Sequence, residues 1–300
     1  MSGLPEPGSV PDRAGDLAGR TADPAAVNVL VAPVDGGFDP TGVELVEGGY
    51  EGPNAGDLGR LAATVEALDA LDALDASDAS GTARLHYPEP DPEVGGPWLV
   101  VEPLSGRLST AHAGRGRLVV DLADLPPGVD AGLRAVREHL ADVLDAARPA
   151  HEHYPVERDE EGVFTRGMTT LSLAGVDAGG ERATVRFDVS TTPTTRAGEV
   201  ESLVADLACV CEARYEPVAE FARSDPPRSL CRAAEAAAER AVGDWEYEWF
   251  PEPTAFSRLP TGAKLALGTG RPGAGSFGVE AYECCRAMLR GTLARYGGDA

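Results

Sequence analysis

Four acidic side chains stand beside predicted strand ends and helix starts, where they could bind a ligand together. Asp35 and Glu93 each follow an apolar strand, and Glu102 ends another one. Asp57 opens a helix after a Gly-rich turn. In an α/β fold, ligands gather at the carboxyl ends of strands and at helix N-termini. The sequence therefore predicts that these four acids converge on one edge of a sheet, although each also has a capping or solvation role open to it.

A second group of candidate ligands lies in a Pro- and Glu-rich stretch near the middle of the chain. His151 and His153 flank Glu152 there, and Glu157 follows. Imidazole combined with carboxylate suits zinc, so this segment could hold a metal ion. The alternative is an exposed acidic loop, where such residues are ordinarily found, and the sequence favours the loop.

Two glycine-rich patterns in the last part of the chain imitate known motifs. Gly268, Gly270 and Gly273 satisfy GxGxxG between a predicted strand and a helix, but no later strand with a ribose-binding acid is expected after them. The stretch AGSFG puts Ser276 at the tip of a would-be nucleophile elbow, yet all five histidines precede this serine, contrary to the hydrolase order. Neither a dinucleotide enzyme nor a serine hydrolase is expected.

The two outer parts of the chain carry the pattern of an α/β body. Strands are expected at residues 26–32, 82–87, 98–102 and 264–267, and helices from residue 57 onward, at 230–242 and at 279–296. In the helix that Asp57 opens, Leu61, Val65 and Leu68 keep a spacing of three to four residues. These side chains therefore share one apolar face.

The middle of the chain is typical of an α+β insert. Strands are expected as a hairpin of residues 107–112 and 115–122, as a second pair of 168–174 and 183–189, and as a closing strand at 215–220. Apolar residues at helical spacing predict helices at 130–147 and 197–214. This order indicates a ferredoxin-like sandwich, with residues 1–104 and 223–300 forming the α/β body and residues 105–222 the insert.

The charge balance excludes one class of partner. Asp and Glu number 49 against 26 Lys and Arg, and the resulting formal charge of −23 would repel a phosphate backbone, so no nucleic acid is expected to bind. Lys264 is the only lysine. A carboxylate-rich surface with so little lysine resembles that of salt-loving archaeal proteins, and we interpret the acidity as adaptation to salt.

The sequence also indicates a compartment. No apolar run is long enough to cross a bilayer, and residues 1–16 lack the pattern of a signal peptide. The five cysteines are odd in number and include no CxxC pair, which argues against a disulfide framework or a zinc knuckle. A cytoplasmic protein without membrane contact is expected.

Several segments follow one another in an order that resembles a known enzyme family. VNVLVAPVDG (27–36) is similar to a strand ending in HxD, and residues 50–68, which contain GDLGRL, to a GRGAxDMKGG segment that opens a helix. ARLHYPEPDPEVGG (83–96) is similar to a strand leading into DEExGG, residues 99–120 to an EPTG stretch, and the stretch between 262 and 289 to a GPG loop and closing helix. The family is that of the dinuclear zinc amidohydrolases and exopeptidases, which includes acetylornithine deacetylase, succinyl-diaminopimelate desuccinylase, aminoacylase and glutamate carboxypeptidase.

The resemblance implies a fold and a set of metal ligands. The fold is a zinc-exopeptidase-like α/β body with an inserted ferredoxin-like lid or dimerisation domain. Asp57 matches the carboxylate that bridges two metal ions, Glu93 a ligand of one ion, and Glu102 a ligand of the other. Asp35 matches the acid that orients the first histidine ligand. The implied partners are zinc or another divalent metal, a small acyl-amino acid or peptide, and a second copy of the chain in a homodimer.

The sequence departs from the family pattern at the residues that the chemistry needs. Pro33 and Ser276 stand where histidine ligands belong, and Pro92 stands where the general-base glutamate belongs. A catalytic zinc ion needs about three protein ligands and an open position for water. The oxygen ligands that remain favour Mg, Mn or Ca over zinc, and loss of the base costs roughly 10²- to 10⁴-fold in rate.

The expected function is therefore that of a degenerate homologue of metal-dependent deacylases and exopeptidases, with lost or much reduced amide hydrolysis. Two alternatives stay open. The first is an active metal-dependent hydrolase of N-acyl amino acids or peptides that uses substitute ligands such as His86, His151 or His153. The second is a stable scaffold that binds no ligand.

Overall fold

The computed structural model describes residues 4–19, 27–31, 38–74, 83–91, 94–112, 114–123, 170–179, 182–191, 197–205, 210–219, 222–247, 259, 263–270 and 275–298. The chain forms two compact units. The first consists of Met1–Ala111, Arg223–Phe250 and Thr254–Ala300, and the second of His112–Ala222 and Pro251–Pro253. The second unit is thus inserted into the first along the sequence.

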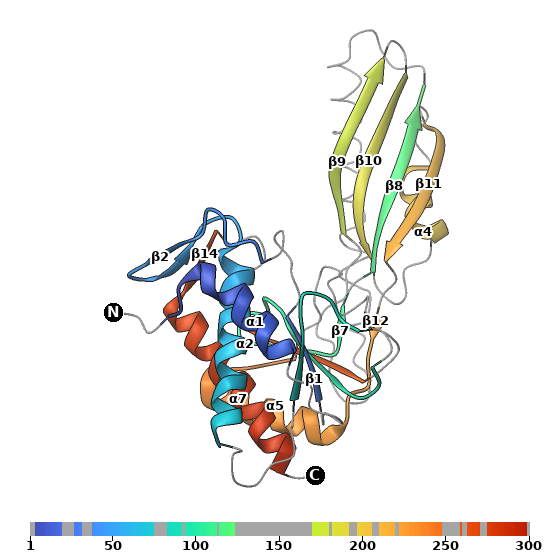
Figure 1. Cartoon of the computed structure of the whole chain (residues 1–300). Helices are drawn as coiled ribbons and strands as arrows, with labels where there is room; N and C mark the ends of the chain where they lie inside the picture. Colours follow the sequence, from blue (N-terminus) through green and yellow to red (C-terminus); the bar gives the residue numbers. More distant parts are fainter. Residues whose placement is uncertain are drawn as a thin grey trace. The chain divides into compact units, whose positions relative to one another are not determined.

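The first unit is built on a five-stranded sheet with the order β4-β1-β5-β13-β6 (Figure 1). The strands are β1 (Val27–Val31), β4 (Ala83–His86), β5 (Trp98–Val101), β6 (Leu108–Ser109) and β13 (Lys264–Leu267). β1 runs parallel to β4 and β5, β13 runs parallel to β5, and β6 is antiparallel to β13. Every residue of β1, β5 and β13 is buried, which explains why these strands read as nearly unbroken apolar runs.

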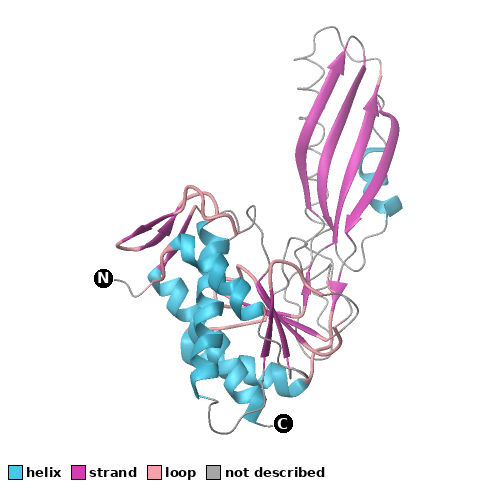
Figure 2. Ribbon diagram, viewed as in Figure 1, coloured by secondary structure: helices cyan, strands magenta, loops and turns pink. Residues whose placement is uncertain are grey.

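The described α-helices of the first unit lie together beside this sheet (Figure 2). They are α1 (Val10–Ala18), which follows the 3-10 turn η1 (Pro7–Ser9), α2 (Ala55–Leu74), α5 (Arg228–Ala241) and α7 (Val279–Gly298). The apolar face predicted for α2 is buried, since Leu61, Val65 and Leu68 are all part of the core. Within the described ranges, no helix has both the length and the apolar character needed to span a membrane.

A small antiparallel sheet brings two distant parts of the sequence together. It consists of β2 (Glu44–Val46), β3 (Gly49–Glu51) and β14 (Ser276–Gly278), in the order β14-β3-β2. Phe277 pairs with Tyr50 in this sheet. Because β3 precedes α2 and β14 precedes α7, the sheet places the starts of these two helices next to each other.

The second unit is a four-stranded antiparallel sheet with the order β11-β8-β10-β9. Its elements are β8 (Gly114–Leu122), β9 (Thr170–Gly179), β10 (Arg182–Thr191), α4 (Ala197–Ala205) and β11 (Val210–Ala219). Counted along the chain the strand order is 4-1-3-2, which is that of a ferredoxin-like fold. Leu118, Phe187 and Val200 belong to a core of its own. The helix expected at 130–147 lies outside the described residues, and β7 (Ala111–His112) pairs with β12 (Ala222–Arg223) in a separate sheet.

Two elements expected in the middle of the chain differ from the prediction. Residues 107–112 and 115–122 do not form a hairpin, because β6 pairs with β13 while β8 pairs with β10 and β11. The helix expected at 197–214 ends at Ala205, and β11 begins at Val210. The apolar spacing continues through Val210, but the residues that follow form the edge strand of the sheet, so pairing with β8 decides their conformation.

Candidate functional site

Asp57 and Arg60 form an ion pair in the first turns of α2 that is closed off from water. Both side chains are 0% exposed, and the Arg60 guanidinium Nη2 donates to Asp57 Oδ1. The two residues are three positions apart, a spacing that brings side chains together on one helix face. Asp57 therefore occupies the helix start that the sequence predicts, and a cation of the same helix binds it there.

An aromatic ring from β14 packs against the first turns of α2, the helix that carries this pair. A Cβ on Gly59 would lie 2.2 Å from Phe277 Cδ1, so only a glycine allows the ring to lie against α2. A Cβ on Gly270 would lie 2.9 Å from the same ring and 3.7 Å from Arg60 Nη1. Phe277 itself is 1% exposed. Two glycines therefore make room for the buried Phe277 ring, and one of them, Gly270, also lies near the guanidinium.

Glu102 lies directly after β5 and is 0% exposed. Its backbone N–H donates to the carbonyl oxygen of Leu267, at the end of β13, over 2.9 Å. Gly268 follows with a φ of +150°, and a Cβ there would lie 2.1 Å from the Glu102 carbonyl oxygen. The close approach of two backbones therefore explains the first glycine of the GxGxxG pattern, and no phosphate-binding turn is needed.

The segment 267–270 lies beside both described acids of the predicted site. Its first half packs on the backbone of Glu102, and Gly270 lies beside Arg60, which holds Asp57. Four further positions that the sequence singled out are outside the described residues: Asp35, Glu93, Pro33 and Pro92. The convergence of all four acids on one edge thus stays a prediction.

The side chains described in this region do not form a set of ligands that suits a catalytic zinc ion. Within the described part of the chain, no three His, Cys, Asp or Glu side chains form a group that could hold a metal ion. Asp57 faces a guanidinium, and Ser276, which stands where the resemblance places a histidine ligand, is an exposed residue of β14. A catalytic zinc ion needs about three protein ligands and a position open to water, and a fully buried ion pair offers neither.

His86, the first candidate substitute ligand, is fully engaged at the end of β4. The backbone N–H of Asp91 donates to His86 Nδ1 over 3.3 Å, and His86 Nε2 lies 3.0 Å from Asn28 Oδ1. The Asn28 amide nitrogen donates to the carbonyl of Gly95 over 3.1 Å, which fixes the oxygen toward His86. His86 is therefore neutral with its proton on Nε2, and neither nitrogen offers a lone pair to a metal. His151 and His153 lie outside the described residues.

Arg60 is the residue of this region that the sequence reading missed. In the GRGAxDMKGG segment the third residue after the aspartate is a glycine, and Arg60 stands at that position here. An arginine three residues after an aspartate on an amphipathic helix is ordinarily a surface pair, worth a fraction of a kcal/mol. Arg60 could have been recognised from the sequence, because a long charged side chain stands at a position where the similar motif has glycine.

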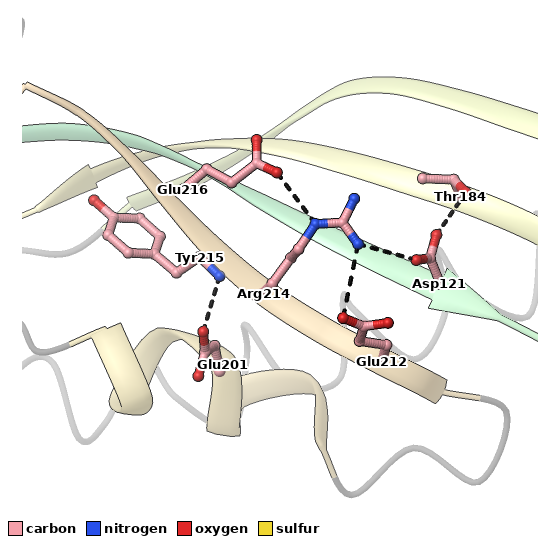
Figure 3. Close-up of polar contacts among 7 residues, drawn as sticks. All are labelled: Asp121, Thr184, Glu201, Glu212, Arg214, Tyr215 and Glu216. Atoms are coloured by element: carbon pink, nitrogen blue, oxygen red, sulfur yellow. Dashed lines mark hydrogen bonds and ion pairs between the residues drawn. The ribbon is translucent and has the colours of Figure 1, made fainter.

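A separate group of polar contacts lies on the second unit, around Arg214 of β11 (Figure 3). Arg214 Nε donates to Glu216 Oε1 over 3.1 Å, Nη1 donates to Asp121 Oδ2 over 3.3 Å, and Nη1 lies 3.9 Å from Glu212 Oε1. The hydrogen bond that Arg214 donates to Glu216, with the neighbouring carboxylates, raises the pKa of Arg214. Thr184 Oγ1 donates to the other Asp121 oxygen over 2.6 Å. Water screens these exposed pairs, so they carry little stability and mark no ligand site.

Comparison with solved structures shows which proteins share this fold. An M20 family metallo-carboxypeptidase from Sulfolobus solfataricus matches with a TM-score of 0.58 at 12% identity, over 97% of this chain and 93% of that chain. The aminopeptidase PepT from Bacillus cereus gives a TM-score of 0.56 at 12% identity over 92% and 82%, and the dipeptidase Dug1p from Saccharomyces cerevisiae gives 0.52 at 16% over 93% and 81%. No family model matches the sequence, and no curated protein matches it.

The chain thus has the fold of metal-dependent peptidases and amidohydrolases. The α/β fold class predicted from the sequence is confirmed, and the resemblance to the zinc exopeptidases is confirmed at the level of the fold. Sequence identities of 12–16% carry the architecture but not the residues of the site. What the site does has to be argued from the side chains of this chain.

Proposed function

We propose that this chain is a non-catalytic relative of metal-dependent deacylases and exopeptidases, in which amide hydrolysis is lost or much reduced. The observation that carries the proposal is the buried pair of Asp57 and Arg60. In the family resemblance this aspartate is the carboxylate shared by two metal ions. Here it accepts a hydrogen bond from a guanidinium, and neither side chain reaches water.

The rest of the predicted machinery supports the same conclusion. Metal-dependent amide hydrolysis needs a polarised carbonyl, an activated water and a group that takes the proton of that water. Pro92 stands where the resemblance places the base, and Pro33 and Ser276 stand where it places imidazole ligands. Proline can neither accept a proton nor coordinate a metal through its side chain. A framework that keeps its fold while losing these groups is suited to a role other than turnover.

An assay of the full-length protein tests the proposal. We expect purified protein, supplied with Zn²⁺, Mn²⁺ or Co²⁺, to release amines from N-acyl amino acids and dipeptides no faster than a protein-free blank. The matched variant is Glu102→Gln, which keeps the shape of a buried side chain and removes its charge. The proposal would be overturned if the wild type hydrolyses these substrates and a folded Glu102→Gln variant does so more than about tenfold more slowly. Loss of a true metal ligand or base lowers the rate by at least that factor.

A further inference from the structure

Asp57 is a carboxylate with no exposure to water, and a charge in such a place requires a partner of opposite sign. The structure supplies that partner from within the same helix. We propose that Arg60 is a built-in cation that takes the place of a divalent ion at Asp57, so that the folded chain neither needs nor takes up a metal ion there. This inference rests on the proposed function and gives it a physical basis.

The electrostatics favour the guanidinium over a metal ion. Arg60 Nη2 donates to Asp57 Oδ1 with both side chains 0% exposed, so the attraction acts with little screening by water. A divalent ion that approached Asp57 would either meet the positive guanidinium at contact distance or displace it. Displacement would break this buried ion pair, and separating a buried pair is among the costliest single changes in a protein interior.

The packing favours the same arrangement. Phe277 fills the space that Gly59 and Gly270 leave, Gly270 also lies near Arg60, and the ring is itself buried. A metal ion with bound water needs polar groups and room for a coordination shell. A buried aromatic ring provides neither.

The first measurement uses the wild-type chain alone. Metal content is determined on purified full-length protein, and the melting temperature is recorded as purified, after EDTA, and after addition of Zn²⁺ or Mn²⁺. We expect well below one bound divalent ion per chain and melting temperatures that agree within about 1 °C, because only an ion that binds the folded state shifts its stability. One or more ions per chain, together with a fall of several degrees after EDTA, would overturn the inference.

The second measurement uses three variants of the pair: Asp57→Asn, Arg60→Met and the double variant. Each single variant breaks the buried ion pair and is expected to melt about 10 °C below the wild type. The double variant removes both charges and is expected to recover at least half of that loss. The matched control is Glu283→Gln, which breaks an ion pair of the same three-residue spacing with Arg286 on α7, where both side chains are exposed. It is expected to change the melting temperature by no more than about 2 °C.

Two results with these variants would contradict the inference: an Arg60→Met variant that melts with the wild type, or a double variant that melts no higher than the weaker single variant. If the variants do not fold, the wild-type metal measurement still decides. The two proposals can also fail separately. Bound metal without amide hydrolysis would overturn only the role of Arg60, whereas amide hydrolysis by metal-free protein would overturn only the proposed function.

Discussion

His86 is a buried histidine whose charge state follows from its surroundings. Burial, with a smaller contribution from the charge of Arg84, lowers the pKa of His86 to about 4, while Asp91 acts in the opposite direction. The ring also lies against Trp98, with centroids 4.5 Å apart. Both ring nitrogens make hydrogen bonds only when the imidazole is neutral, since protonated Nδ1 could not accept from the Asp91 N–H. The folded state therefore requires neutral His86.

This requirement predicts how stability depends on pH. The unfolded chain binds a proton at His86 near pH 6.5 and the folded chain only near pH 4, so stability is full above about pH 6.5 and is lost as the pH falls toward 4. We expect this group to contribute roughly 1–3 kcal/mol to that loss. Urea unfolding of the wild type and of His86→Asn at pH 7 and pH 5 measures it as the difference between the two pH dependences. Equal pH dependences would show that His86 is not held neutral.

The residues of the site were only partly predictable from the sequence. The position of Asp57 in the first turn of a helix follows from the Gly-rich turn and from the apolar spacing after it, both of which are local signals. The pairing of Asp57 with Arg60 is equally local, but its burial is not. It depends on tertiary packing around α2, to which β14 contributes Phe277 from the far end of the sequence. A surface pair and a buried pair have the same sequence spacing, so only the tertiary structure distinguishes them.

Among the secondary-structure elements, those with a strong local pattern were predictable and those defined by their partners were not. β1, β5 and β13 are short apolar runs, and α2 and α7 are each 20 residues long with apolar residues at helical spacing, so each carries its own signal. β6 is two residues long and joins the parallel sheet through β13. Nothing in its sequence specifies that partner. The end of α4 was missed for the same reason, because pairing with β8 makes the residues from Val210 onward a strand.

Where the ends of β5 and β13 meet, we expect one added methyl group to lower the stability of the fold strongly. Gly268 has a φ of +150°, and a Cβ there would meet the Glu102 carbonyl oxygen at 2.1 Å, which is backbone that cannot turn aside. We expect Gly268→Ala to lower the free energy of unfolding by about 3 kcal/mol or more. The control is Gly15→Ala in α1, where a Cβ meets nothing within 4 Å and alanine favours the helix by up to about 1 kcal/mol. Chemical denaturation of the two variants measures both, and a Gly268→Ala variant as stable as the control would show that the two strand ends can separate at little cost.

For the whole molecule, the formal charge predicts net repulsion between like charges. The formal charge is −23, and the excess of acids is visible even between neighbouring strands: Glu44 of β2 and Glu51 of β3 stand directly opposite each other, and both are exposed. Like charges in that position destabilise an antiparallel pair. Attractive contacts such as those of Arg214 are exposed and contribute little each. Added salt weakens both kinds of interaction, and with so large a net charge the relief of repulsion outweighs the loss of attraction.

We therefore expect the melting temperature to rise between 0.1 M and 1 M KCl, as the screening length falls from about 10 Å to about 3 Å. A variant separates screening from a general effect of salt on protein hydration. Glu51→Gln removes one of the two facing charges and is expected to raise the melting temperature by about 1–2 °C at 0.1 M KCl, with a smaller gain at 1 M because salt has already screened the repulsion there. Thermal unfolding of both proteins at the two salt concentrations measures the four values. Two outcomes would contradict this explanation: a wild type that melts at a lower temperature in 1 M KCl, or a Glu51→Gln gain in melting temperature that is the same at both salt concentrations. Salt that screens charges over the whole surface must also screen the facing pair of Glu44 and Glu51, so either outcome would mean that salt does not act by relieving charge repulsion.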